Sequence, residues 1–69
     1  MSFIKIIETV GTSPDSWEDA VRNAVKEATE LPIFKSMNKI RSVNIKEFDV
    51  EVNDSNVTEF LCRVEILLE

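Results

Sequence analysis

Side chains able to bind charged or polar ligands gather in the second half of this 69-residue chain. Four of them recur at short intervals within two apolar stretches, and these are Arg41, Asn44, Lys46 and Arg63. Cationic and amide groups on one strand face can hold a phosphate or an adenine-bearing ligand. The same spacing also fits an exposed face whose charges are solvated or paired across strands with residues such as Glu65.

Cys62, the single cysteine of the chain, is a second side chain that could bind a ligand. Thiols from neighbouring copies could gather at a symmetry axis and hold a soft ligand such as a metal ion or selenium. Cys62 is, however, in phase with Phe60 and Val64 in an alternating segment. This phase favours a small core residue on the helix-facing side, and a metal ligand at Cys62 is the secondary interpretation.

Oxygen-bearing side chains cluster around a sequence with turn chemistry, at Glu51, Asn53, Asp54 and Asn56. Carboxylate and amide oxygens are the ligands that Ca²⁺ prefers in proteins. The cluster lacks the central glycine and the terminal glutamate of a helix-loop-helix calcium loop. Calcium at this acidic hairpin is therefore an alternative that the spacing alone does not establish.

Catalysis finds little support among the available side chains. The chain contains no histidine, so its serines have no imidazole base to activate them as nucleophiles. Nothing places a pair of its 13 acidic residues in a cleft rather than on solvated faces. We therefore expect a binding protein and not an enzyme.

The elements that position these groups follow from the spacing of apolar residues. Residues 3–10 are rich in β-branched side chains and predict a strand, which Gly11 is expected to end. From Ser13 the apolar residues recur at three- and four-residue steps, which predicts an amphipathic helix. Ser13 is the expected N-cap, and Pro32 is expected to stop the helix.

Two further strands are predicted over residues 39–52 and 57–68, joined by turn chemistry at residues 53–56. The first of them keeps its apolar side chains on one face only if one residue is skipped at Lys46-Glu47. Such a slip predicts a β-bulge. The stretch from Ile33 to Met37 fits either a short extra turn of helix or an apolar cover.

Two aromatic side chains are interpreted as packing residues. Trp17 lies on the same helical stripe as Val21 and Ala24, which places it in the core or at a contact between subunits. Phe48 neighbours the expected bulge, where side chains are re-aimed, so it could instead face a ligand. We favour packing for both.

These elements predict one α+β domain over residues 1–69, with a three-stranded antiparallel sheet wrapped on one helix. The other face of the sheet mixes Leu61 and Leu67 with charged side chains, which suits a subunit contact or a ligand wall. A chain of this length buries only about 60% of the surface its unfolded form exposes. Because a single cysteine allows no internal disulfide, we expect self-association to complete the core.

Charge and hydropathy narrow the set of partners. The chain has 8 basic and 13 acidic residues and a net charge of -5, which repels nucleic-acid phosphates. No apolar run approaches the roughly 20 residues that span a bilayer, and the first residues lack the pattern of a signal peptide. With the lone thiol, these features predict a cytoplasmic protein without a nucleic-acid or membrane partner.

Several segments together resemble the dodecins, small flavin-binding proteins that assemble into hollow dodecamers. The resemblance rests on four runs, which are residues 6–13, the helix start Ser16-Trp17-Glu18-Asp19-Ala20, Asn23-Ala24-Val25 within the helix, and residues 57–68. Ile40-Arg41-Ser42-Val43 aligns with the start of the family's second strand. It implies a homododecamer that binds riboflavin or FMN. In the family, a tryptophan at the position of Ser42 stacks on the flavin, and a glutamine at the position of Leu61 hydrogen-bonds it.

Both of these positions differ here in a way that weakens a flavin site. Stacking on an aromatic face contributes about 0.5–1.5 kcal/mol, and Ser42 offers no ring. Each buried polar group left without a partner costs about 1–3 kcal/mol, and Leu61 offers no amide. The resemblance therefore implies the fold more strongly than the ligand.

We expect a storage protein whose pockets form between copies of the chain, from the outer faces of the two later strands. The expected lining residues are Arg41, Ser42, Asn44, Lys46, Leu61 and Arg63. The ligand would be a flavin in a modified pose or another planar cofactor. The alternatives are a carrier of a soft ligand or an ion at Cys62 or the acidic hairpin, and a structural shell without a ligand.

Overall fold

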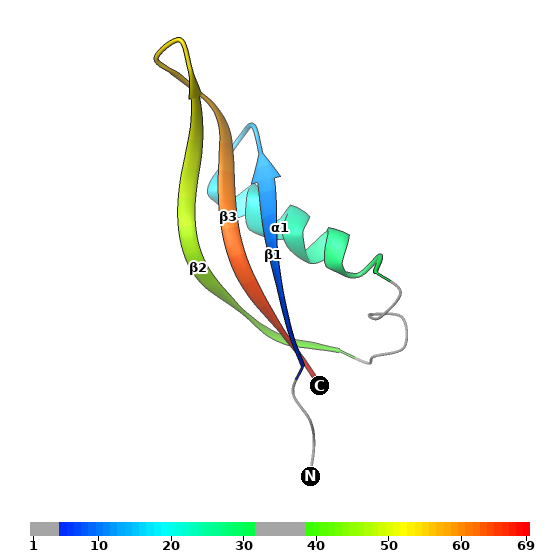
Figure 1. Ribbon diagram of the computed structural model, residues 1–69. Coiled ribbons are helices and arrows are strands. Elements are labelled where there is room, and N and C mark those ends of the chain that lie inside the picture. Colours follow the sequence, from blue (N-terminus) through cyan, green and yellow to red (C-terminus); the bar gives the residue numbers. More distant parts are fainter. Residues whose placement is uncertain (1–4, 32–38) are drawn as a thin grey trace.

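Four elements make up residues 5–31 and 39–69, the part of the chain that the computed structural model describes (Figure 1). They are β1 (Lys5–Ser13), α1 (Trp17–Ala28), β2 (Ile40–Asn53) and β3 (Asn56–Leu68). The strands form one antiparallel sheet in the order β1-β3-β2, which confirms the predicted α+β fold. The stretch from Ile33 to Met37 lies outside the described residues.

Strand β1 continues past Gly11, so the prediction that this glycine ends the strand is wrong. Gly11 pairs with Cys62 and lies against α1. A Cβ atom at this position would overlap the carbonyl oxygen of Ala20 and lie 2.7 Å from Ala24 Cβ. The absence of a side chain, and not a turn, is therefore what the fold requires of residue 11.

Helix α1 begins later than predicted, with Ser16 and not Ser13 as its N-cap. Ser16 Oγ accepts a hydrogen bond from the backbone N–H of Asp19 at 3.0 Å, which satisfies one of the unpaired donors of the first turn. Ser13 is fully buried and stabilises the turn before the helix. Its hydroxyl accepts from the Asp15 N–H at 2.9 Å and donates to the Asp19 carboxylate at 2.7 Å.

The helix also ends earlier than the predicted stop at Pro32. Beyond Ala28, the N–H groups of Glu30 and Leu31 donate to carbonyls three residues back, at 3.1 Å each. A tighter turn thus replaces the α-helical hydrogen bonds before the proline is reached. Among the described residues, no helix is both long and apolar enough to cross a membrane.

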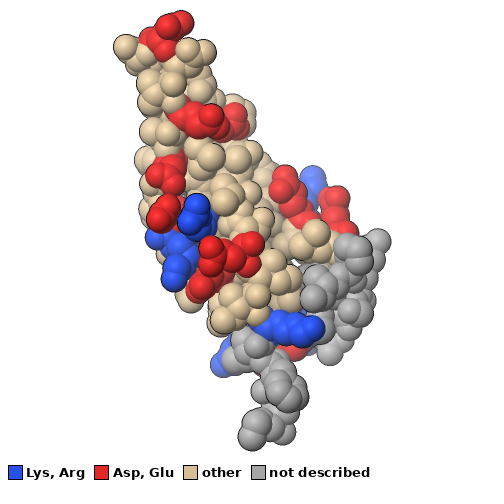
Figure 2. Space-filling model, in the orientation of Figure 1, with Lys and Arg blue, Asp and Glu red and all other residues tan. Residues whose placement is uncertain are grey.

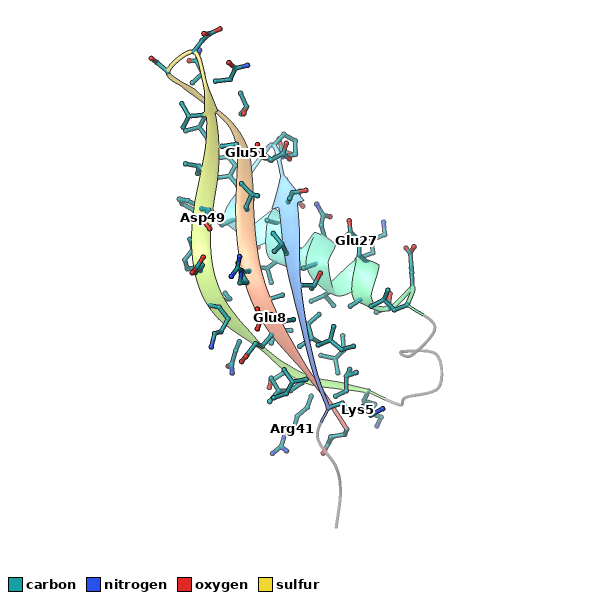
Figure 3. The ribbon with its side chains drawn as sticks, viewed as in Figure 1. Lys5, Glu8, Glu27, Arg41, Asp49 and Glu51 are labelled. Carbon is teal, nitrogen blue, oxygen red and sulfur yellow. The ribbon has the colours of Figure 1, made fainter. Side chains whose placement is uncertain are left out.

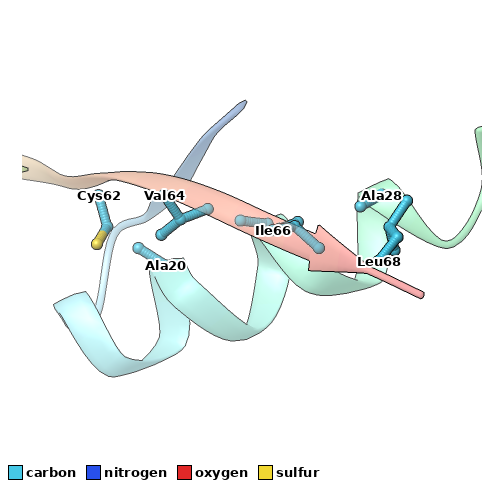
Figure 4. Packing of buried hydrophobic residues seen from close by; sticks show 7 residues of the cluster. Ala20, Ala28, Cys62, Val64, Ile66 and Leu68 are labelled. Atoms are coloured by element: carbon cyan, nitrogen blue, oxygen red, sulfur yellow. The ribbon is translucent and has the colours of Figure 1, made fainter. Parts of the chain in front are cut away.

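The core lies between α1 and the middle of the sheet (Figure 4). Its fully or nearly fully buried apolar residues are Ala20, Ala24, Ala28, Cys62, Val64, Ile66 and Leu68. The prediction that Cys62 faces the helix is confirmed. Because the helix presents only alanines here, it lies close to β1 and β3 and leaves much of the same side of β2 uncovered.

Strand β2 contains the predicted bulge. Ile45 pairs with Val64 and Glu47 with Arg63, which leaves Lys46 as the extra residue. Further register shifts lie near Arg41 and at the hairpin end of the strand, and neither was predicted. The bulge at Lys46 preserves one apolar face along a strand of 14 residues.

The hairpin turn falls where its sequence predicts. Asp54 and Ser55 have φ angles of 50° and 64°, the left-handed values that a two-residue hairpin turn requires at both central positions. Asn56 Nδ2 donates to the Asp54 carbonyl oxygen at 3.2 Å. Beyond Ser13 and Phe60, where β1 stops pairing, this hairpin continues as a two-stranded arm.

Candidate functional site

The side of the sheet turned away from α1 is the candidate site, and we call it the outer face. Residues of β3 alternate between the core and this face, because Cys62, Val64, Ile66 and Leu68 are buried against the helix. The outer face is therefore made of Leu61, Arg63, Glu65 and Leu67 of β3, with their cross-strand partners Ile6, Glu8, Val10, Thr12, Ser42, Asn44, Glu47 and Asp49. It combines hydrogen-bonding groups with apolar ones.

Charges of both signs meet at the middle of the outer face. Figure 2 shows Lys and Arg side chains gathered there with acidic side chains beside them. Lys46 Nζ lies 3.7 Å from Glu65 Oε2, which also places the bulged lysine on this face. Glu8 pairs directly with Glu65, and like charges at opposed positions repel. Lys46 offsets part of this repulsion.

A shallow hollow of about 310 Å³ opens on the outer face between β1 and β3, and it is lined by Glu8, Thr9, Val10 and Arg63. Of these four residues, only Arg63 was predicted to contact a ligand. The contribution of β1 was missed because the site was expected on the two later strands. The pairing of Val10 with Arg63 depends on register between distant segments, which the sequence pattern does not reveal.

The predicted lining residues lie on the same face but not at one place. Ser42 pairs with Leu67, whereas Leu61 lies six residues further along β3, about 20 Å away at about 3.3 Å per residue. Lys46 and Arg63 lie between these two ends. Ser42 and Leu61 are therefore not neighbours within one copy of the chain.

The outer face has no aromatic side chain among the described residues. Trp17, Phe48 and Phe60 all lie on the helix side, where the Trp17 ring meets the other two edge-on at centroid distances of 5.6 and 5.2 Å. Trp17 Nε1 also donates to the Asp49 carbonyl oxygen at 2.9 Å. Trp17 thus contacts Phe48 and Phe60 within the chain, although Trp17 and Phe48 stay 38% and 56% exposed. The described residues of the outer face offer no ring on which a flavin could stack.

The two alternative sites are Cys62 and the acidic hairpin. Cys62 is fully buried, and burial raises the pKa of its thiol because the charged thiolate is poorly solvated there. Near the hairpin, Glu51 and Glu59 lie directly opposite each other. Within residues 5–31 and 39–69, no three acidic, cysteine or histidine side chains come together as a group that could hold a metal ion.

The fold and the outer face define a small α+β protein with one helix on one side of its sheet and an open, mixed face on the other. The sequence matches the family model described as Dodecin over residues 3–69. The chain therefore belongs to the dodecin family.

Similar proteins agree with this placement. The chain is 33% identical over 66 residues to calcium dodecin from Mycobacterium tuberculosis, across 96% of this chain and 86% of that protein. The solved structure of calcium dodecin from the same organism superimposes with a TM-score of 0.77 at 32% identity and is described as having a novel calcium-binding site. Dodecin from Streptomyces coelicolor superimposes with a TM-score of 0.82 at 26% identity, and each comparison covers 96% of this chain and 87% of the other.

Proposed function

We propose that this chain assembles with copies of itself, as a dodecamer by analogy with its family, and stores a small planar ligand between them. The observation that carries the proposal is the outer face, whose hydrogen-bonding and apolar side chains are left open by the single helix. Because Ser42 and Leu61 lie about 20 Å apart in one copy, we infer that a pocket lined by both forms between two copies.

Within such a pocket the side chains have distinct tasks. The guanidinium groups of Arg41 and Arg63 would pair with a phosphate or another anionic group of the ligand. Ser42 and Asn44 would donate and accept hydrogen bonds at its edge, and Leu61 would cover its flat surface. The Lys46–Glu65 pair, at 3.7 Å, would orient the lysine at the rim. These groups bind the ligand and exclude water from it. We propose no reaction at this site.

Flavin is the family ligand to test first, because the two departures at Ser42 and Leu61 can be reversed. We expect weak quenching of riboflavin or FMN fluorescence by the wild-type protein, and much tighter binding by the Ser42→Trp/Leu61→Gln double variant. One stacked ring, at about 0.5–1.5 kcal/mol, and one restored hydrogen bond, at about 1–3 kcal/mol, predict a gain between about tenfold and a thousandfold.

The matched control is Ser55→Trp, which adds the same ring at the exposed hairpin turn. Native mass spectrometry of freshly purified protein reports the number of copies and any retained small molecule together. A wild-type monomer would reject storage between copies. An oligomer whose double variant binds flavin no better than Ser55→Trp would reject the flavin pocket at Ser42 and Leu61.

Calcium is the second candidate, and it is favoured by the similarity to calcium dodecin from Mycobacterium tuberculosis. The acidic side chains at the arm, Glu51, Asp54 and Glu59, are exposed or half-buried and would need oxygen ligands from a second copy to complete a site. Calorimetric titration of the oligomer with CaCl₂ tests this. We expect Asp54→Asn to weaken any calcium binding, with Asp15→Asn, on the loop before α1, as the control.

We also propose a cellular location and partners for the chain. A single thiol that is buried in the core needs no oxidising compartment, which agrees with storage in the cytoplasm. The net charge of -5 disfavours nucleic acid and anionic lipid as partners. The partners we propose are therefore other copies of the chain and a small molecule.

A further inference from the structure

The hollow between β1 and β3 on the outer face lies between side chains of opposite charge. Its volume of about 310 Å³ is near the lower limit of small-molecule sites, and it is lined by Glu8, Thr9, Val10 and Arg63. Figure 3 shows Glu8 near the middle of the sheet, away from Arg41 near one end. Both strands belong to the same copy, so a ligand in the hollow contacts one chain on two sides.

Glu8 and Arg63 hold their charges apart across the hollow. Glu8 pairs with Glu65, so Arg63, two residues before Glu65, is its diagonal neighbour. Diagonal neighbours on one face of a sheet lie about 7–8 Å apart, within reach of long side chains. Within residues 5–31 and 39–69, however, neither Glu8 nor Arg63 forms an ion pair with another side chain. Both side chains are exposed, and their charges are therefore accessible to a ligand.

The surroundings of Glu8 favour a positive group. Glu8 and Glu65 lie directly opposite each other, and their carboxylates repel. Lys46 Nζ lies 3.7 Å from Glu65 Oε2 and offsets this repulsion from the β2 side only. On the β1 side, the hollow opens beside Glu8. An ammonium group placed there would neutralise the Glu8 carboxylate and donate a hydrogen bond to it.

The surroundings of Arg63 favour an anionic group of low charge. A guanidinium binds a carboxylate or a phosphate through two parallel hydrogen bonds. Arg63 lies opposite Glu47 of β2. Glu8 and Glu65 are its other acidic neighbours on the outer face. A phosphate dianion would be repelled by these carboxylates more strongly than a ligand carboxylate, which carries a single charge.

Apolar side chains adjoin these two charges. Val10 lines the hollow and is 42% exposed, and the half-buried Leu61 lies next to it, opposite Thr12. We propose that the hollow binds an aromatic α-amino acid, with its ammonium on Glu8 and its carboxylate on Arg63. Val10 and Leu61 contact its ring. This inference rests on the proposed function, because it takes Arg63 as a ligand contact and names the planar ligand, and it adds Glu8 and Val10 to the site.

The first test compares three probes that share one ring. They are L-phenylalanine, phenylpropionate, which lacks the ammonium, and phenethylamine, which lacks the carboxylate. An exposed ion pair contributes about twofold to fivefold in affinity, so L-phenylalanine should bind more tightly than either analogue by about this factor. NMR titration of isotope-labelled wild type should show saturable shifts at the amides of Glu8, Val10 and Arg63. Equal binding of the three probes, or shifts confined to other residues, would overturn the proposal.

The second test removes each charge of the hollow in turn. Glu8→Gln should lose the preference for L-phenylalanine over phenylpropionate, and it should bind phenylpropionate more tightly than the wild type because a repelling charge is gone. Arg63→Gln should lose the preference over phenethylamine. Glu18→Gln and Arg22→Gln, which alter the exposed 2.7 Å ion pair on α1, are the matched controls and should keep both preferences. Glu8 and Arg63 variants that behave like these controls would reject the two assigned contacts.

The mass of the wild-type protein, measured on the same samples, separates this site from the storage function. A monomer that binds L-phenylalanine in the hollow would support the site and reject storage between copies. An oligomer that retains a planar molecule but does not prefer L-phenylalanine over its two analogues would reject the amino acid and leave the storage function standing. Circular dichroism checks that each variant keeps its helix, and the comparison of probes on the wild type needs no variant at all.

Discussion

At the residue scale, Cys62 combines a packing role with a titratable group. It is the only cysteine, it is fully buried beside α1, and it pairs with Gly11 at the centre of the sheet. Burial raises the pKa of its thiol, so the folded chain holds the proton more tightly than the unfolded chain does. The stabilisation linked to this group is complete below the pKa of the unfolded thiol, about 8.5, and is lost as the pH rises through the folded value.

We therefore predict that the free energy of unfolding decreases between about pH 7.5 and pH 9.5 more steeply in the wild type than in Cys62→Ala. The chain has no histidine or tyrosine, so no such side chain competes in this interval. Urea unfolding at both pH values, for both proteins, measures the difference. Equal pH dependence in the two proteins would show that the thiol has the same pKa folded and unfolded.

Ser42 and Leu61 illustrate what single residues could and could not indicate. Their types already argued against a stacked flavin, because a hydroxymethyl group and an isobutyl group cannot replace a ring and an amide. Their positions on one face followed from alternation along the strands. Their separation of about 20 Å did not, because it depends on where β2 pairs with β3.

At the element scale, the contact between α1 and β1 depends on small residues on both sides. Gly11 of the strand faces Ala20 and Ala24 of the helix so closely that a methyl group has no space. Asn23 Nδ2 adds a hydrogen bond to the Thr12 carbonyl oxygen at 2.9 Å. These contacts hold the helix over β1 and β3, and they leave the arm of β2 uncovered.

Gly11→Ala should accordingly be strongly destabilising. Overpacking usually costs about 1–3 kcal/mol, and the upper end applies here because the added methyl group meets a backbone carbonyl that cannot turn away. The exposed neighbour Thr12→Ala is the control and should change the stability by only about 0.5 kcal/mol. Thermal and urea unfolding compare the two variants, and similar stabilities would contradict the close helix–strand contact.

The bulge at Lys46 was the element-scale feature most clearly predicted by the sequence. The apolar residues Val43 and Ile45 change phase relative to Phe48 and Val50, and a bulge is the local solution that keeps all four on one face. The shift near Arg41 left no such trace, because only Ile40 precedes it in the strand. The end of the helix was misjudged since a tight turn after Ala28 precedes the proline.

At the scale of the whole molecule, the sheet is covered on one side by a helix that is too narrow for it. On the helix side of β2, the apolar side chains Ile45, Phe48 and Val50 are exposed, and the outer face is mixed and open. Within residues 5–31 and 39–69, the core of this 69-residue chain has seven buried apolar residues. Self-association would bury further apolar surface at both faces, and it would thereby stabilise the protomer as well as form the pockets.

This predicts that the thermal midpoint rises with protein concentration, because unfolding of an oligomer releases several chains. Calorimetry over a roughly hundredfold range of concentration measures the effect. A wild-type midpoint independent of concentration would indicate a protomer that is stable alone.

The sequence by itself determined the order of the elements, the amphipathic helix, the hairpin turn at residues 53–56 and the bulge at Lys46. Each of these follows from local spacing, since periods of two and of three to four residues reflect the backbone geometry of strands and helices. Only the tertiary structure decided why residue 11 must be glycine, which serine caps the helix, how far Ser42 lies from Leu61 and which apolar side chains stay exposed. These features depend on the register and approach of segments far apart in the chain, and a local pattern carries no information about either.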